Sequence, residues 1–407
     1  MTFDNIDVHS RSKDSVKLDV DISWHGECDV ELDASGLPGV GVEKVRLSGR
    51  MSIVFCPLVP AIPPFSAMQV AFINPPLFEL DFTGAADLAD FSLIKKCVRK
   101  AIHDILASIL VLPNRMLIKM DPANDYFKSF QTDLGVLRLT CVSGKGFTTP
   151  KGFFKDVPDV CCQIRLGASA IWNTSAINNS ETPEWNETRD FLFSDLEQII
   201  SIDALDDDLV NDDTLGFGSI NVKELLQKGK TAEVKLCDTS GGKPTGASVT
   251  VKADIYNYVP NINSFEQAEP NAKDRMVGLL TVIVAGVKKV PGDRESLASS
   301  VKVSFAGQEF ATPVVTDMPG LDPCNPALDT AFRMPLTGEM AAAKSDIELR
   351  LYDGKSKTGA KVFSFDQIIG APGLNVNSVD SPDMFALENG ATLQASVSVC
   401  GLELNAN

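Results

Sequence analysis

Carboxylates are the side chains in this sequence whose number and spacing most clearly suggest a chemical role. Many of them lie in one short stretch. Residues 201–220 read SIDALDDDLVNDDTLGFGSI, where a strand-like apolar run ends in five aspartates within eight residues and returns at once to Leu215, Gly216 and Phe217. Carboxylates this close repel one another. The segment is therefore either a solvated acidic turn or a place where a cation binds.

The spacing of these aspartates excludes an EF-hand. Counting from Asp206 puts Val210 and Asn211 at the positions of the third ligand and the glycine of that motif. A loop between β-strands offers another arrangement. Asp206 and Asp208 point to one side where a strand ends, and Asp213 returns from the far end of the loop.

A second loop, residues 151–160, brings further carboxylates. Calcium takes about six to eight oxygen ligands, so four or five aspartates from two loops would fill most of a site. We expect calcium to bind at Asp159, Asp206, Asp208 and Asp213, with Asp156, Asp207 and Asp212 as weaker candidates. A solvated acidic turn is the alternative.

The tips of the same two loops are apolar. Phe153 and Phe154 lie between two lysines, and Leu209 and Val210 interrupt the aspartates. Exposed apolar side chains among charges would insert into a membrane. The alternative is that they are ordinary core residues.

No convincing catalytic constellation accompanies these carboxylates. The stretch LCDTSGG places Asp238 in a turn like that of aspartic proteases, but their mechanism needs two such carboxylates and no second copy exists. The three histidines lie beside no nucleophile or zinc motif. We expect a surface turn at Asp238 and no enzyme.

Composition limits the partners. The chain has 407 residues, 44% of them hydrophobic, and a formal net charge of −17, which argues against nucleic acid as a partner because phosphates need clustered lysine and arginine. Nine scattered cysteines without a CxxC pair indicate neither a disulfide scaffold nor a zinc site. Residues 51–78 are uncharged, but six prolines exclude a transmembrane helix there.

The elements that must position the aspartates belong to a weak internal repeat. GVLRLTCVSGKGF (135–147) resembles GLLTVIVAGVKKV (278–290), CQIRLG (162–167) resembles KVSFAG (302–307), and SIDALDDDL (201–209) resembles ELRLYDGKS (348–356). Each copy has short alternating strands separated by turn residues, which predicts an antiparallel β-sandwich. The second copy keeps only Asp353 among Lys355, Lys357 and Lys361, so we expect it to be independent of calcium.

The first 125 residues follow another pattern. Strands are predicted at 15–23, 44–55 and 67–73, and a helix at 90–112. This region is therefore α+β. Alternation sends an excess of apolar residues to common faces, which favours a groove for lipid acyl chains over an ordinary core; the predicted lining residues are Met51, Ile53, Phe55, Met68, Val70, Phe72, Phe78, Leu80, Phe82, Ile105 and Ile109.

Several motifs together resemble the extended synaptotagmin and tricalbin family, which includes the plant synaptotagmins. GVEKVRLSGRMSIVFCPLVPAIPPFSAMQVAFINPPLFELDFTGAADL (41–88) and LVLPNRM (110–116) are similar to its SMP domain, a TULIP-like lipid-binding fold. GVLRLTCVSGKGF, ETPEWNE (181–187) and LDDDLVNDDTLG (205–216) are similar to its first C2 domain. The resemblance is strong over about 15–257 and weak beyond.

The resemblance implies a mainly β protein with an SMP part at 1–125, a calcium-binding C2 domain at 134–260, a linker at 261–275 and a degenerate C2 domain at 276–407. It carries the family's calcium ligands to Asp159, Asp206, Asp208 and Asp213. Two departures lower the expected affinity: Val160 and Cys161 replace the usual Pro-Tyr, and Phe153 stands where C2 domains often have aspartate. Met1 falls inside the SMP pattern, so we expect the domain's first half and the family's membrane hairpin to be missing.

The function implied is lipid binding and transfer at membrane contact sites, with calcium-dependent attachment through the first C2 domain. The expected partners are phospholipids and an anionic membrane surface, with a homodimer through the SMP domain and no nucleic acid. The expected location is the cytosolic face of membranes, at contacts between endoplasmic reticulum and plasma membrane. The alternatives are a calcium-dependent adaptor with a vestigial SMP segment and, with only Asp238 in support, a hydrolase.

Overall fold

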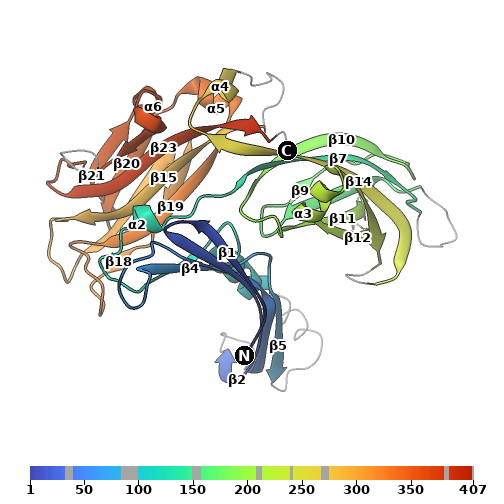
Figure 1. Ribbon diagram of the computed structural model, residues 1–407, viewed down its shortest axis with the longest axis horizontal. Helices are drawn as coiled ribbons and strands as arrows, with labels where there is room; N and C mark the ends of the chain where they lie inside the picture. Colours follow the sequence, from blue (N-terminus) through green and yellow to red (C-terminus); the bar gives the residue numbers. More distant parts are fainter. Residues whose placement is uncertain are drawn as a thin grey trace. The chain divides into compact units, whose positions relative to one another are not determined.

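The computed structural model describes residues 1–32, 40–83, 100–148, 157–207, 213–238, 242–266, 275–379 and 385–405. The chain divides into two compact units (Figure 1), one made of Met1–Asn124 and Thr132–Ala253 and the other of Asp125–Gln131 and Asp254–Asn407. In the part of the chain that is described, no helix is long and apolar enough to cross a membrane.

The first unit begins with an antiparallel sheet in the order β1-β2-β3-β4-β6, with β5 paired to β3. Its strands are β1 (Thr2–Ser12), β2 (Ser15–Leu32), β3 (Val40–Phe55), β4 (Ala67–Phe72), β5 (Leu77–Thr83) and β6 (Met116–Lys119). The predicted strands are confirmed, and β2 and β3 are longer than expected because they pair with each other from Val16–Phe55 to Leu32–Val40.

Strand β1 was not predicted from the sequence. Its apolar residues Phe3, Ile6 and Val8 are irregularly spaced and exposed, so period-two alternation is hard to see. Pairing across the short turn to β2 makes this segment a strand, with a register shift between Asp4 and Asp7.

The predicted helix is described from residue 100 and runs to residue 110, two residues short of the expected end. Val111 forms a bridge with Phe72, and the Leu112 amide donates to the Phe72 carbonyl at 3.0 Å. The backbone just before Pro113 therefore pairs with the edge of β4 and does not continue the helix.

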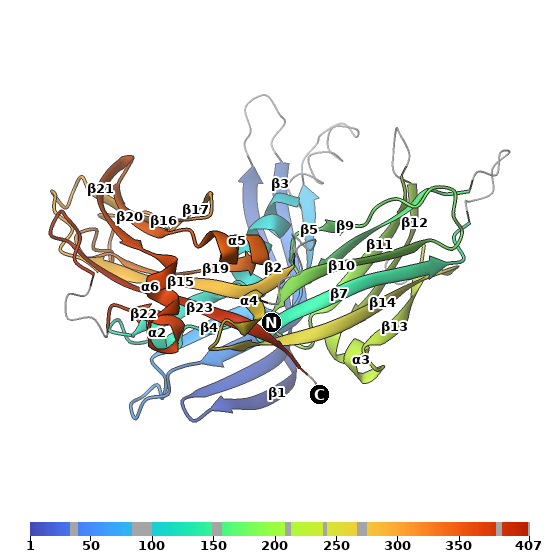
Figure 2. The same cartoon turned by 90° about the horizontal axis from the view of Figure 1, so that it is seen from above.

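The rest of the first unit is a β-sandwich. One layer contains β7 (Gly135–Lys145), β10 (Glu184–Phe193), β13 (Thr231–Cys237) and β14 (Pro244–Val259); the other contains β8 (Val160–Leu166), β9 (Trp172–Asn173), β11 (Ile199–Asp206) and β12 (Asp213–Asn221). Figure 2 shows β10, β7 and β14 side by side. Helix α3 (Val222–Gln227) follows β12. The alternating buried side chains of both layers form the core.

The second unit is another sandwich. One layer contains β15 (Met276–Lys288), β19 (Ala327–Thr337), β22 (Asn375–Asn377) and β23 (Thr392–Leu404); the other contains β16 (Ala298–Phe305), β17 (Gln308–Ala311), β18 (Val315–Thr316), β20 (Ile347–Asp353) and β21 (Ser356–Phe363). Short helices complete it: α2 (Tyr126–Ser129), α4 (Asn263–Glu266), α5 (Gly338–Ala343), α6 (Phe365–Ile369) and η1 (Pro372–Leu374). The strands β15, β16 and β20 correspond to β7, β8 and β11, as the internal repeat predicted.

Candidate functional site

Three aspartates lie at one end of the first sandwich. In the sheet register, Asp206 at the end of β11 lies opposite Val160 of β8 and opposite Asp213 of β12. Asp159 directly precedes Val160. The strands therefore bring Asp159, Asp206 and Asp213 to a single edge although they are distant in sequence.

Hydrogen bonds fix two of these carboxylates. The Asp159 amide donates to Asp206 Oδ1 at 2.7 Å, and the Asp207 amide donates to the Asp159 carbonyl at 2.9 Å. Asp159 Oδ1 accepts from the Asn179 amide at 2.7 Å. Asp206 is buried, with 8% of its surface exposed, whereas Asp207 and Asp213 are exposed. The edge thus presents rigidly held carboxylates beside exposed ones, all hard oxygen donors of the kind calcium prefers.

The other predicted residues at this end lie outside the described part of the chain: Asp156, Asp208 and Asp212 among the ligands, and Phe153, Phe154, Leu209 and Val210 among the loop tips. Within the described ranges, no three acidic, histidine or cysteine side chains converge closely enough to hold a metal ion. The role of Asn179 was missed because it acts through its backbone, which leaves no side-chain signal in the sequence.

The second sandwich repeats this geometry with fewer acids. Asp353 Oδ1 accepts from the Ala298 amide at 2.9 Å, and the Gly354 amide donates to the Ala298 carbonyl at 2.8 Å. Ala298 therefore occupies the place of Asp159, and Asp353 that of Asp206. A carboxylate at the position of Asp206 therefore joins two loops by a hydrogen bond, whether or not further acids surround it.

An arginine pairs with two further acids at this end of the second sandwich. Arg294 Nε lies 2.9 Å from Asp317 Oδ1, and Arg294 Nη1 lies 3.4 Å from Asp322 Oδ1. Hydrogen bonding to Asp317 raises the pKa of Arg294 above its ordinary value. This residue was not predicted from the sequence, although an arginine within GDRESLASS was a visible signal.

The apolar face of the first sheet contains most of the predicted groove residues. The register places Val20, Met51 and Phe72 in one row across three strands. The next rows contain Leu18, Ile53, Val70 and Met116, then Val16, Phe55, Met68 and Ile118. Leu80 and Phe78 pair with Val45 and Leu47 on β3; Phe82 belongs to β5, but its side chain is outside the described part.

This face is only partly covered. Phe72, Val70 and Leu80 are buried, while Met51, Ile53, Phe55, Met68 and Phe78 are half-buried. From the helix, Ala107 and Leu110 pack on the sheet. Ile105 and Ile109 are 56% and 49% exposed. The helix therefore covers only part of the face, and Ile105 and Ile109 remain accessible, so their groove role stays a prediction.

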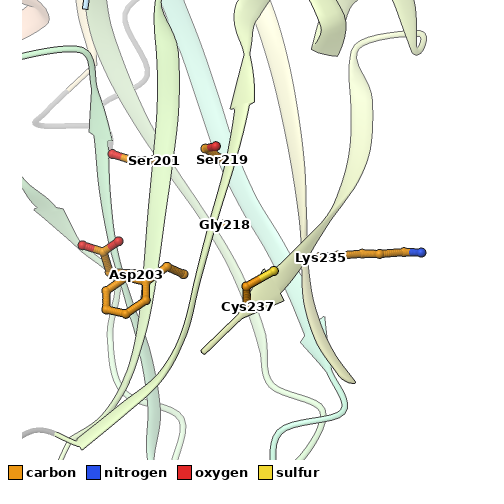
Figure 3. A pocket seen from close by; sticks show the side chains of 7 residues that line it. Ser201, Asp203, Gly218, Ser219, Lys235 and Cys237 are labelled. Carbon is orange, nitrogen blue, oxygen red and sulfur yellow. The ribbon is translucent and has the colours of Figure 1, made fainter. Parts of the chain in front are cut away.

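A shallow cavity of about 440 Å³ lies on the outer face of β11, β12 and β13, lined by Ser201, Asp203, Phe217, Gly218, Ser219, Lys235 and Cys237. Asp203 is paired with Arg165 at 3.2 Å. In Figure 3 the Lys235 side chain points away from the other labelled residues. The lining groups therefore do not converge on an ion. Asp238 nearby accepts from the Lys243 amide at 2.7 Å and closes a hairpin turn.

Comparison with known proteins agrees with this architecture. Residues 3–121 match the Synaptotagmin-like mitochondrial-lipid-binding domain family, and residues 135–236 match the C2 domain family. Among curated relatives, Extended synaptotagmin-1 of Pongo abelii is 27% identical over 55% of this chain, and Extended synaptotagmin-2 of Homo sapiens is 29% identical over 52%. This chain spans only 21% and 24% of their lengths.

A solved structure shares the fold over nearly all of this chain. The SMP domain and two C2 domains of Extended-Synaptotagmin 2 match 99% of this chain and 87% of that one, with a TM-score of 0.63 and 21% identity. The calcium-bound pair of C2 domains of the same protein matches 68% of this chain with a TM-score of 0.53. The chain therefore contains a Synaptotagmin-like mitochondrial-lipid-binding domain and a C2 domain followed by a second sandwich, and in this arrangement it is similar to the extended synaptotagmins.

Proposed function

We propose that this chain binds membrane lipids on the apolar face of its SMP sheet, carries them between closely apposed membranes, and attaches to an anionic membrane surface through calcium at the first C2 domain. The role is non-enzymatic. We place it at contacts between the endoplasmic reticulum and the plasma membrane, on their cytosolic faces, because the family relatives point there.

The observation that carries the lipid proposal is the incomplete burial of Leu18, Ile53 and Met116, which lie in one row of the SMP sheet. Leu18 and Ile53 are half-buried, and Met116 is 39% exposed. A sheet that packed against an ordinary core would bury this row completely. Covering apolar surface with an acyl chain gains about 0.8 kcal/mol per methylene. The same surface, left open, would favour a homodimer through the SMP domain.

The calcium proposal rests on the aspartate edge of the first C2 domain. Asp159, Asp206 and Asp213 would hold the ion, and Asp208 would join them from the loop. Asp156, Asp207 and Asp212 are supporting candidates, and the four apolar loop residues would enter the membrane. A bound ion supplies positive charge that relieves the repulsion between the carboxylates and favours an anionic lipid surface.

Lipid loading tests the central claim. The purified chain should carry phospholipid detectable by native mass spectrometry, and Ile53→Glu should remove most of it because a carboxylate on the apolar row repels acyl chains. The matched control is Val362→Glu, which places the same charge at a 50% exposed apolar residue of β21.

The proposal fails if the unaltered chain takes up no lipid when offered vesicles, or if Val362→Glu loses lipid as completely as Ile53→Glu. Ile53→Thr, a milder change at the same site, separates lost binding from lost folding. It should leave the melting temperature nearly unchanged and still reduce loading.

A further inference from the structure

The face of the SMP sheet opposite the apolar one is buried although it carries charge. Lys17 and Asp19 of β2 are 7% and 3% exposed, and Ser52 of β3 and Gln69 of β4 are 0% and 5% exposed. Charged side chains are almost never fully buried unless they are paired. Some other part of the first unit must therefore cover this polar face and neutralise it.

Over Lys17 and Arg50, the covering segment is residues 194–199 of the first C2 domain, which comprise the turn between β10 and β11 and the first residue of β11. The Lys17 ammonium pairs with the Asp195 carboxylate and lies 2.8 Å from Asp19 Oδ2. Arg50 Nε lies 2.6 Å from Glu197 Oε2. Two basic side chains of the sheet thus meet two acidic side chains of the turn, and the Lys17 and Asp195 side chains are only 9% and 8% exposed.

Neutral contacts extend the same joint. Asn74, just beyond β4, donates from Nδ2 to the Glu197 carbonyl at 2.9 Å and accepts at Oδ1 from the Ile199 amide at 2.7 Å. Ala168 of the C2 domain separately packs against the cluster that includes Phe72 and Val111, on the apolar side of the sheet. The joint on the polar face therefore combines ion pairs with hydrogen bonds between the Asn74 side chain and the backbone of the turn.

Hydrogen bonds within the first C2 domain hold the turn in its conformation. Gln198 Oε1 accepts from the amides of Ser194 and Asp195 at 2.7 and 3.2 Å, and Asp195 Oδ1 accepts from the Glu197 amide at 2.9 Å. These bonds hold the Asp195 carboxylate and the backbone at Glu197 in position before any contact with the sheet. Preorganisation of this kind lowers the entropy cost of docking.

We propose that the polar face of the SMP sheet is a permanent docking surface for residues 194–199 of the first C2 domain, so that the two domains act as one body with or without calcium. Strand β11 begins at Ile199 in the joint and ends at Asp206 on the aspartate edge. Its seven residue steps separate the two by about 23 Å. An ion at the far end therefore leaves the joint intact, and loop attachment to a membrane orients the SMP sheet with it. The joint itself does not depend on the proposed lipid function.

Hydrogen exchange on the full chain tests this. Asn74→Ala lies in the SMP domain and should speed exchange in residues 195–201 of the C2 domain, where the Ile199 amide loses its acceptor. Asp195→Asn lies in the C2 domain and should speed exchange in residues 15–21 of the SMP domain. Losing one hydrogen bond corresponds to roughly a five- to tenfold faster exchange. Adding calcium should not change either result.

The matched control is Asn325→Ala in the second C2 domain, where Asn325 also bridges loops, accepting from the Lys289 amide at 3.0 Å and donating to Asp322. It should leave residues 15–21 and 195–201 unchanged. The proposal is wrong if Asn74→Ala and Asp195→Asn each alter only their own domain. If hydrogen exchange rises throughout the chain, the double variant Lys17→Met/Asp195→Leu, which replaces the ion pair by two apolar side chains, distinguishes a lost joint from general unfolding. Restored protection of residues 195–201 in this variant supports the joint, and continued fast exchange there contradicts it.

Discussion

At the scale of single residues, the aspartate at the end of β11 has two separable properties. Asp206 fastens the Asp159 amide through Oδ1, and Asp353 does the same for Ala298 in the second C2 domain, where few acids remain. The hydrogen bond therefore stabilises the fold, whereas the negative charge of Asp206 contributes to the proposed calcium site. Asparagine keeps an oxygen acceptor and removes the charge, so substitution can separate the two.

We predict that Asp206→Ala destabilises the first C2 domain by about 1–3 kcal/mol in the absence of calcium, because it leaves the half-buried Asp159 amide without its acceptor. Asp206→Asn should cost less than about 1 kcal/mol, because Oδ1 remains and repulsion with Asp213 falls. Urea unfolding in a chelating buffer measures both. Equal losses of unfolding free energy for the two variants would show that the hydrogen bond accepted by Asp206 Oδ1 does not stabilise the domain.

At the scale of elements, a short segment between the SMP domain and the first C2 domain belongs to the second unit. Helix α2 begins after Asp125, which accepts from the Phe127 amide, and it packs near β15. Arg333 of β19 lies 5.3 Å from the centre of the Phe130 ring. Tyr126 is buried there, and burial raises its pKa to about 12.

The raised pKa predicts an alkaline instability. Tyr126 is neutral in both folded and unfolded chains below about pH 10, so its contribution is fully present there. Between about pH 10 and 12 the unfolded chain ionises first, and about 2–3 kcal/mol of stability should be lost.

Denaturant unfolding of the full chain at pH 9 and pH 12, compared with Tyr126→Phe, measures this loss because phenylalanine cannot ionise. A stability difference between the two proteins that stays constant with pH would contradict it.

At the scale of the whole molecule, the net charge of −17 opposes an anionic membrane. Calcium at the aspartate edge would reverse the charge locally while leaving the rest of the surface acidic. The attachment should therefore be conditional on the ion and sensitive to salt.

We predict that the chain sediments with phosphatidylserine-containing vesicles only when calcium is present, and less at high salt. Asp206→Asn should weaken this binding at least about tenfold, because it removes a ligand charge and keeps the loop fastened. Asp353→Asn makes the same change in the second C2 domain and should have no effect. Binding without calcium, or equal losses for the two variants, would show that the aspartate edge does not control attachment.

Much of the architecture could be predicted from local patterns. Alternation in β7, β8 and β11 and the matching segments of the second copy indicated two sandwiches, because a half-buried strand exposes every second side chain. Alternation also placed Met51, Ile53 and Phe55 on one face, which the pairing with β4 confirms. It did not reveal β1, because that strand depends on its partner.

The sequence by itself determined the fold class, the resemblance to the extended synaptotagmins and the carboxylate-rich end of the first C2 domain, since all three depend on residue types at short spacing. Only the tertiary structure decided that Ala107 and Leu110 of the helix pack on the sheet while Ile105 and Ile109 stay exposed, and that Arg294 pairs with Asp317 and Asp322. The joint of Lys17 with Asp195 likewise connects residues 178 positions apart. Such contacts depend on which surfaces meet after folding, and no local pattern encodes them.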